Sequence, residues 1–281
     1  MTGLVMEGGA MRGLFTAGVT DVLMEHGITF DGAVGVSAGA TFGINYKTKQ
    51  IGRALRYNKR YCADPRYGNI RSFLKTGDVF DTQFCYYDIP ERLDPFDTDT
   101  LQENPMEFFT VSSDVESGKP DYHKIVDGKL HDIEYIRASA SMPLVSNIVS
   151  IDGKKLLDGG ITDSIPLSFM ESKGYAKNVV ILTQPMGYVK EKNSFLPLVK
   201  IKYRKYPKFV EAMAIRHEMY NAETAYVARR EAEGAAFVLR PKSALNISPM
   251  TKDTAELQRV YEEGVAVARA SLTELKEFLA N

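Results

Sequence analysis

Gly35-Val36-Ser37-Ala38-Gly39 is the stretch that decides the fold of this chain and indicates its chemistry. It lies between a short apolar run, residues 30–36, and a run typical of a helix, residues 40–56. Gly-x-Ser-x-Gly between a strand and a helix predicts a turn so sharp that the serine backbone is strained, and the flanking glycines remove side chains that would collide there. We expect the serine hydroxyl to project above the sheet edge, near the positive end of the helix. The alternative is an ordinary tight turn that contains a serine.

The beginning of the chain has the same order of strand, loop and helix. Residues 2–6 form an apolar strand candidate, residues 7–13 (Glu-Gly-Gly-Ala-Met-Arg-Gly) a glycine-rich loop, and residues 14–26 a segment with helical spacing. This order predicts an α/β domain. Glycines let backbone N–H groups approach an anion closely, and that anion is either a developing oxyanion or a dinucleotide pyrophosphate.

The dinucleotide alternative fits the loop less well. Its fingerprint, Gly-x-Gly-x-x-Gly, needs a glycine where this chain has Ala10. The expected acid about twenty residues further on is matched in position by Asp31. Asp31, however, begins a strand-like run instead of following one. A Rossmann-like dinucleotide-binding protein therefore stays the less favoured alternative.

Residues 58–104 have weak periodicity, three prolines and many aromatic side chains. This composition is typical of helices and loops, and we expect a cap beside the site. The aromatic side chains form the core of the cap itself, which is the interpretation we favour, or they line an acyl-binding cleft. They are Tyr61, Tyr67, Phe73, Phe80, Phe84, Tyr86, Tyr87 and Phe96.

The rest of the chain supplies further strands and helices. Residues 149–157 predict a hairpin that leads into Asp158-Gly159-Gly160, where the carboxylate can be presented into a cleft, although Asp-Gly is also a common turn. The whole pattern predicts one three-layer α/β/α domain over residues 1–281 with a mainly parallel central sheet, in which residues 196–281 are mostly helical. The other expected strands are 107–112, 122–126 (antiparallel to the first), 178–183 and 235–239, and the other helices 133–140, 209–233 and 252–279.

Composition restricts the classes of function. The chain has 281 residues, of which 44% are hydrophobic and 25% charged, and its net charge is −1, which argues against nucleic-acid binding. Cys62 and Cys85 have no metal-ligand spacing and are expected to be reduced thiols of a cytoplasmic protein. We expect no leader peptide and no membrane span, so that any membrane contact is peripheral. No cofactor or metal is expected, and the sequence leaves the oligomeric state open.

Three motifs along residues 3–185 together resemble the patatin-like phospholipase family. They are the loop Gly8-Gly9-Ala10-Met11-Arg12-Gly13, the elbow at residues 35–39, and Asp158-Gly159-Gly160. Ala138-Ser139-Ala140-Ser141-Met142-Pro143 is similar to the segment of small residues and proline in that family. One departure is Ala10, which replaces the third glycine of the loop and narrows it by a methyl group.

The resemblance implies a Ser–Asp dyad without histidine. Ser37 is then the nucleophile and Asp158 its base, and the substrates are acyl esters of phospholipids or other lipids. Backbone N–H groups around Gly8, Gly9 and Ala10 would form the oxyanion hole, with Arg12 fixing the loop. The glycines that support these motifs are Gly13, Gly35, Gly39, Gly159 and Gly160.

Elementary chemistry agrees with such a dyad and leaves alternatives. A serine hydroxyl is a poor nucleophile until a base takes its proton, and partial burial can raise the pKa of a carboxyl group towards neutrality for this task. A triad would need a histidine after the acid, which only His217 provides, inside a helical run. A non-catalytic protein that binds lipid or acyl groups is a further alternative. The basic run 200–208 is either a solvated face, which we favour, or a contact with anionic lipid.

Overall fold

Five short apolar segments form the parallel centre of an eight-stranded sheet in the computed structural model, which describes residues 1–280. All neighbouring pairs among these five strands run parallel. Parallel strands of this kind are buried on both faces by helices, which explains their nearly continuous apolar sequences. In spatial order they are β3 (Glu107–Asp114), β2 (Gly32–Val36), β1 (Thr2–Met6), β7 (Lys177–Ile181) and β8 (Ala236–Leu239).

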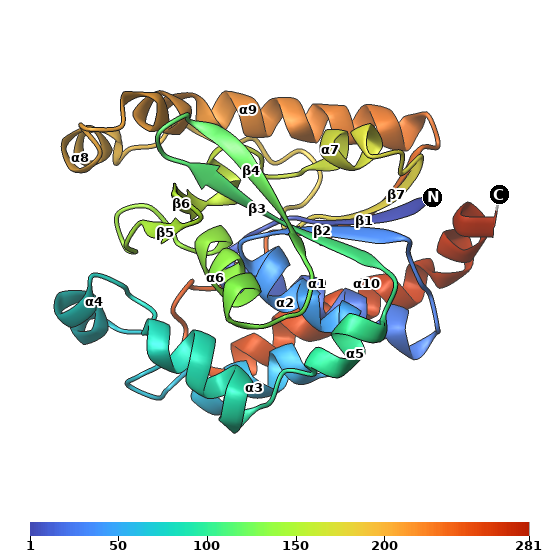
Figure 1. Ribbon diagram of the computed structural model, residues 1–281. Coiled ribbons are helices and arrows are strands. Elements are labelled where there is room, and N and C mark those ends of the chain that lie inside the picture. The colour runs from blue at the N-terminus through green and yellow to red at the C-terminus, as the bar shows by residue number, and fades with distance from the viewer. Residues whose placement is uncertain (281) are drawn as a thin grey trace.

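Alternate side chains of each strand enter two separate cores. In β1, Leu4 and Met6 pack on one side of the sheet and Val5 packs on the other, and all three are fully buried. Figure 1 shows the helices of the two layers on opposite sides of the sheet, which confirms the predicted three-layer α/β/α fold. One layer contains α1 (Gly13–Glu25), α2 (Ala38–Lys47) and α10 (Thr254–Ala280), and the other α7 (Leu167–Ser172) and α9 (Pro207–Ala232).

An antiparallel edge completes the sheet beyond β3. The strand β3 pairs antiparallel with β4 (Lys119–Ile125), as predicted, and also with β6 (Lys154–Asp158), which pairs with β5 (Val149–Ile151). The predicted hairpin turn is present, and both Asp152 and Gly153 have positive φ. The helix α6 (Leu130–Ser139) connects β4 to this hairpin. The prediction of a mainly parallel sheet is thus confirmed, with its antiparallel part confined to one edge.

The prediction of one helix over residues 40–56 is wrong. The chain forms α2 up to Lys47, turns, and begins α3 (Arg53–Tyr61) with Gly52 in the left-handed region at φ 73°. Lys49 also has a positive φ. The side chain of Asp21 accepts a hydrogen bond from the Gly52 amide at 2.9 Å. A contact with a distant helix therefore stabilises the break, which helical periodicity cannot reveal.

Residues 58–104 cover the helical layer of α1 and α2 beside the sheet. They contain the short helices α4 (Ile70–Thr76) and α5 (Thr98–Glu103) and the π-helical segment η2 (Phe84–Leu93). At the other end of the chain, α10 crosses α1 so closely that a Cβ atom on Gly18 or Gly264 would clash with the backbone of the partner helix. None of the helices described over residues 1–280 combines the length and the apolar character that a membrane crossing requires.

Candidate active site

The register of the sheet brings the two predicted catalytic residues together. Val36, the last residue of β2, pairs with Val111 of β3. The next residue of β3, Ser112, pairs with Asp158 at the end of β6. Ser37, the residue after β2, therefore lies at about the same level of the sheet as Asp158, the last residue of β6. Both side chains line one cavity.

The turn at Ser37 has the strained geometry that its motif predicts. Ser37 has φ 54° and ψ −119°, and α2 begins at the next residue. A Cβ atom on Gly39 would clash with the Met6 carbonyl, and one on Gly35 would clash with the Gly39 backbone. The Ser37 amide donates a hydrogen bond to the hydroxyl of Ser139, at 2.9 Å, from the end of α6. The segment of small residues thus holds the elbow in place.

The glycine-rich loop lies directly against the elbow. A Cβ atom on Gly8 would approach the Ser37 Cβ to 3.0 Å, and one on Gly13 would approach the Ala38 Cβ to 2.7 Å. Gly9 packs against the Arg12 side chain, where a Cβ would lie 3.2 Å from its Nε. The loop can therefore keep its amides beside the serine only if these positions carry no side chain.

Ala10 occupies the position of the third glycine in a left-handed conformation, with φ 48°. This conformation costs a residue with a Cβ roughly 1–2 kcal/mol relative to glycine. Ala10 lines the cavity together with Gly8, Gly9 and Arg12. The predicted oxyanion loop thus keeps the conformation suited to glycine despite the methyl group.

A buried carboxylate fixes the start of this loop, although the sequence did not single it out. Glu7 accepts hydrogen bonds from the Thr183 amide at 2.6 Å and from the Tyr220 hydroxyl at 2.7 Å. The Thr183 hydroxyl donates to the Gly8 carbonyl at 2.8 Å. Burial raises the pKa of Glu7, and these donors oppose the rise. No motif marks Thr183 or Tyr220, because their role depends on contacts across the sheet.

Asp158 is buried, with 6% of its surface exposed, and is oriented by its own turn. The Gly160 amide donates to its Oδ1 at 2.8 Å, while a Cβ atom on Gly159 would clash with the Val111 carbonyl. Burial raises the pKa of Asp158, and the Ser37 hydroxyl, the positive charge of Arg216 and the Gly160 amide partly offset this rise. The group is thus a carboxyl whose basicity is raised beside a serine, which suits a general base.

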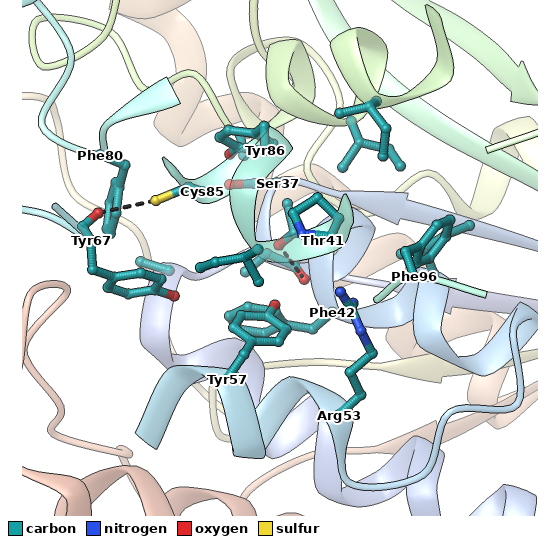
Figure 2. A pocket seen from close by; sticks show the side chains of 18 of the residues that line it. Ser37, Thr41, Phe42, Arg53, Tyr57, Tyr67, Phe80, Cys85, Tyr86 and Phe96 are labelled. Carbon is teal, nitrogen blue, oxygen red and sulfur yellow. Dashed lines mark hydrogen bonds between the residues drawn. The ribbon is translucent and has the colours of Figure 1, made fainter. Parts of the chain in front are cut away.

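Two cavities of different character meet at Ser37. The first has a volume of about 130 Å³ and is largely lined by apolar and aromatic side chains, which Figure 2 shows around the serine. The second has a volume of about 350 Å³ and contains Asp158, the glycine loop and several charged side chains. Aromatic residues of the cap line the first cavity, namely Tyr67, Phe80, Tyr86 and Phe96. Tyr61 and Phe84 instead pack edge to face with each other, so the cap aromatics serve both the core and the cleft.

The histidine alternative receives no geometric support. His217 lies on α9 and its Nε2 faces Glu218 at 3.6 Å. Among residues 1–280, no histidine lines either cavity at Ser37. The acid of the dinucleotide alternative, Asp31, accepts a hydrogen bond from the Thr2 amide at 2.6 Å, which joins the start of β1 to the residue before β2.

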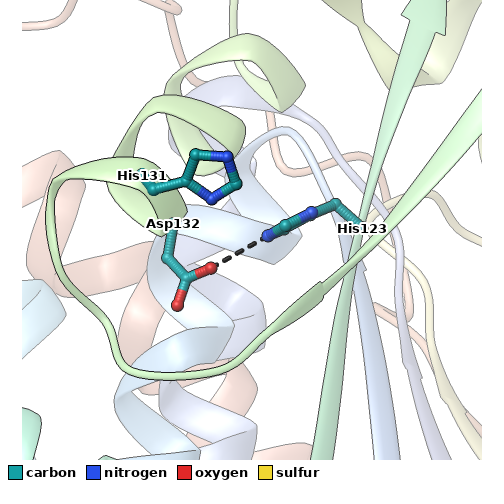
Figure 3. A group of neighbouring side chains, drawn as sticks. All are labelled: His123, His131 and Asp132. Carbon is teal, nitrogen blue, oxygen red and sulfur yellow. Dashed lines mark hydrogen bonds and ion pairs between the residues drawn. The ribbon is translucent and has the colours of Figure 1, made fainter. Parts of the chain in front are cut away.

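One group of side chains has the composition of a metal site, His123, His131 and Asp132, shown in Figure 3. Its members already have structural partners. Asp132 accepts hydrogen bonds from three backbone amides, those of residues 126–128, and bonds His123 Nε2 at 2.9 Å. His131 Nε2 faces the carboxylate of Asp152 at 3.0 Å. A metal ion would have to displace these bonds. The group therefore stabilises the connection from β4 to α6. On α6, Asp132 lies about 10 Å along the helix axis from Ser139.

Comparisons with known proteins give two matching families. The patatin-like phospholipase family matches residues 4–170, and a domain of unknown function (DUF6363) matches residues 206–280. An uncharacterized protein of Escherichia coli strain K12, YjjU, is 32% identical over 187 residues, which cover 65% of this chain and 52% of YjjU. Lysophospholipase NTE1 of Meyerozyma guilliermondii is 26% identical over 291 residues, which cover 98% of this chain and 19% of that protein.

The chain thus spans about half the length of the first relative and about a fifth of the second. Among solved structures, that of VipD from Legionella pneumophila aligns with a TM-score of 0.44 and 11% identity, covering 96% of this chain and 67% of VipD. The patatin-like match extends from the first strand through the glycine loop, the serine elbow and the Asp-Gly-Gly turn. The chain belongs to the patatin-like phospholipase family.

Proposed function

We propose that this protein is a serine hydrolase of lipid acyl esters, with Ser37 as nucleophile and Asp158 as its base. The observation that carries the proposal is the convergence of a strained serine, a buried carboxyl group and a glycine loop in one cavity. Membership of the patatin-like phospholipase family and the lysophospholipase name of the fungal relative support lipid esters as substrates. The whole chain, residues 1–281, would act as one domain, because Tyr220 of α9 contacts the loop through Glu7.

In the acylation step, the Ser37 hydroxyl oxygen attacks the ester carbonyl carbon while its proton passes to the Asp158 carboxylate. The negative charge that develops on the carbonyl oxygen is stabilised by backbone N–H groups of Gly8, Gly9 and Ala10 and by the positive end of α2. The bond to the leaving alcohol then breaks, and Asp158 returns the proton to its oxygen.

In the deacylation step, water attacks the acyl-enzyme. Asp158 takes a proton from that water, and the Ser37 oxygen leaves and regains the proton. The apolar cavity beside Ser37 would hold the acyl chain, because burial of each methylene group contributes about 0.8 kcal/mol. The leaving alcohol would then occupy the second cavity at the serine, which contains Asp158 and is called the polar cavity below.

The proposal is tested by reaction with a fluorophosphonate probe and by hydrolysis of a panel of p-nitrophenyl esters and phospholipids. We expect the probe to label Ser37, as located by peptide mass spectrometry, because only an activated serine reacts at a useful rate. A protein that binds lipid without catalysis would bind the same esters and leave the probe unreacted. That outcome would favour the non-catalytic alternative.

A surface beside the polar cavity is suited to contact with a membrane. The short helix α8 (Leu196–Lys202) and the residue before it expose three apolar side chains, the α8 apolar patch, which consists of Phe195, Leu198 and Ile201. Phe195 also lines the polar cavity. Exposed cationic side chains lie in α8, in the turn after it and at the start of α9, and they are Lys200, Lys202, Arg204, Lys205 and Lys208. We propose that this surface rests on an anionic lipid surface, because each cation near such a surface contributes about 1 kcal/mol.

Changing the α8 apolar patch should therefore weaken vesicle binding. We expect the double substitution Leu198→Glu and Ile201→Glu to lower partitioning onto phosphatidylglycerol-containing vesicles at least about tenfold, since it replaces two exposed apolar side chains that the membrane would bury with two negative charges. Co-sedimentation measures the partitioning. Val126→Glu changes an equally exposed residue after β4, at the opposite end of β3 from the elbow, and serves as the control. Equal binding by the double variant and the wild type would exclude this surface as the contact.

A further inference from the structure

The polar cavity has an excess of positive charge. Three cations line it: Arg12 from the glycine loop, Lys190 from the segment between β7 and α8, and Arg216 from α9. The carboxyl groups of Glu7 and Asp158 also line it, and hydrogen-bond donors already engage both. With all five groups ionised the net charge is +1, and burial raises the pKa of both carboxyl groups, which favours a still more positive cavity.

The contacts of Lys190 and Arg216 described below are with neutral groups, while the charges of Arg12 and Arg216 act on the Glu7 and Asp158 carboxyl groups; the three cations are called the cationic wall below. The Lys190 ammonium lies 4.5 Å from the centroid of the Tyr220 ring. Arg216 Nε donates a hydrogen bond to the Gly160 carbonyl. Arg12 Nε is buried and has no hydrogen-bond partner in the described part of the chain. An unsatisfied buried donor costs free energy, which a bound anion would recover.

The backbone of Lys190 is held in place before any ligand binds. The side chain of Asn221 on α9 accepts a hydrogen bond from the Lys190 amide at 2.8 Å and donates one to its carbonyl at 3.1 Å. Burial lowers the pKa of Lys190 to about 8, and the charge of Arg216 lowers it as well. A fixed backbone and an ammonium group that is already partly desolvated lower the cost of binding an anion.

We infer that the cationic wall binds a phosphate group of the leaving alcohol and that Lys190 selects phosphate-containing esters over neutral acyl esters. This inference rests on the proposed hydrolase function and names its substrate class. With the acyl chain in the apolar cavity and the ester carbonyl at Ser37, the leaving group extends into the cavity that the wall lines. Hydrogen bonds from charged donors to phosphate are about twice as strong as neutral ones.

The inference also assigns a role to the region that matches a domain of unknown function. Arg216, Tyr220 and Asn221 lie within residues 206–280, and Lys190 lies between the two matched regions. These residues lie on or are clamped to α9, which places them beside the glycine loop. The second region therefore supplies the leaving-group side of the substrate site.

Binding is tested first, because it does not depend on turnover. Glycerol phosphate and glycerol are titrated calorimetrically into the full chain and into Lys190→Gln, Lys190→Arg and Lys192→Gln. We expect glycerol phosphate to bind the wild type more tightly than glycerol does, and Lys190→Gln to weaken its binding about 10- to 100-fold. Lys190→Arg keeps the charge, and Lys192→Gln changes an exposed lysine on the same segment, so both retain binding. Equal binding by Lys190→Gln and wild type would overturn the inference.

Turnover then tests whether the cationic wall binds the phosphate of a lipid substrate and not only free phosphate compounds. Palmitoyl lysophosphatidylglycerol and monopalmitoylglycerol carry the same acyl chain and are dispersed in the same non-ionic detergent. The loss of kcat/KM in Lys190→Gln should be about 10- to 100-fold larger for the lysophospholipid than for the neutral ester. Equal losses on both esters would overturn selection by Lys190. If the wild type hydrolyses neither ester, the proposed function fails, while the titration still decides whether the wall takes phosphate.

Discussion

We expect Ser37→Ala to abolish ester hydrolysis and to leave the fold intact. Removal of the nucleophile of a serine hydrolase lowers kcat by about 10⁴-fold or more. The Ser37 backbone amide, not its hydroxyl, makes the hydrogen bond to Ser139, and that amide remains in the variant. Alanine also tolerates the positive φ of this position no worse than serine does. Turnover of a p-nitrophenyl ester and the thermal midpoint of unfolding, measured side by side, check both parts.

The comparison needs a control that separates loss of the hydroxyl from disturbance of the elbow. Ser139→Ala removes the acceptor of the Ser37 amide and keeps the nucleophile. We expect it to lower kcat less than Ser37→Ala does, because it shifts the turn without deleting the reacting atom. Ester turnover by Ser37→Ala at the wild-type rate would leave the proposed hydrolase without its nucleophile.

The fold could be predicted from the sequence where a pattern repeats locally. The apolar runs that became β1, β2 and β7 are visible because both of their faces are buried, that of β8 is apolar although two of its residues are only half-buried, and the glycines around Ser37 mark the turn. The break between α2 and α3 could not be predicted, because the hydrogen bond between Asp21 and Gly52 joins segments far apart in the chain. Periodicity reports the burial of a helix face and not the contacts that end a helix.

The candidate site divides in the same way. The proposed nucleophile, its proposed base and the glycine loop were predicted from motifs, because the proposed chemistry requires glycines at fixed spacing from the reacting residue. Glu7, Lys190 and Tyr220 were not predicted to matter, because their positions depend on how α9 lies across the sheet. The effect of Arg216 on Asp158 could not be predicted either, because Arg216 carries no motif and no spacing rule relates it to Asp158.

Asp158→Asn should lower kcat by about 10²–10⁴-fold, the usual contribution of a general base. The amide keeps the size of the side chain and still accepts the hydrogen bond from the Gly160 amide through its oxygen. It cannot take the proton of Ser37. His217→Ala is the matched control, and it should keep most of the activity, since His217 faces Glu218 and does not line the cavity. A larger loss in His217→Ala than in Asp158→Asn would favour the triad.

The pH dependence of activity and stability in the wild type and in Asp158→Asn shows whether Asp158 acts as a base or only supports the structure. Burial raises the pKa of Asp158, so wild-type kcat/KM should rise with pH as this carboxyl group ionises, above the pH at which an ordinary aspartate does. The residual activity of Asp158→Asn should lack this rise.

The stability of the fold should respond to pH in the opposite direction. A carboxyl group with a raised folded pKa destabilises the fold once the pH exceeds its unfolded pKa, so Asp158→Asn should unfold at a higher temperature than the wild type at neutral pH. This advantage should vanish as the pH falls below about 4, where the carboxyl group is protonated in both states. Thermal unfolding across this pH range would contradict the argument if the variant were the less stable protein at pH 7, because the buried charge would then support the fold instead of the reaction.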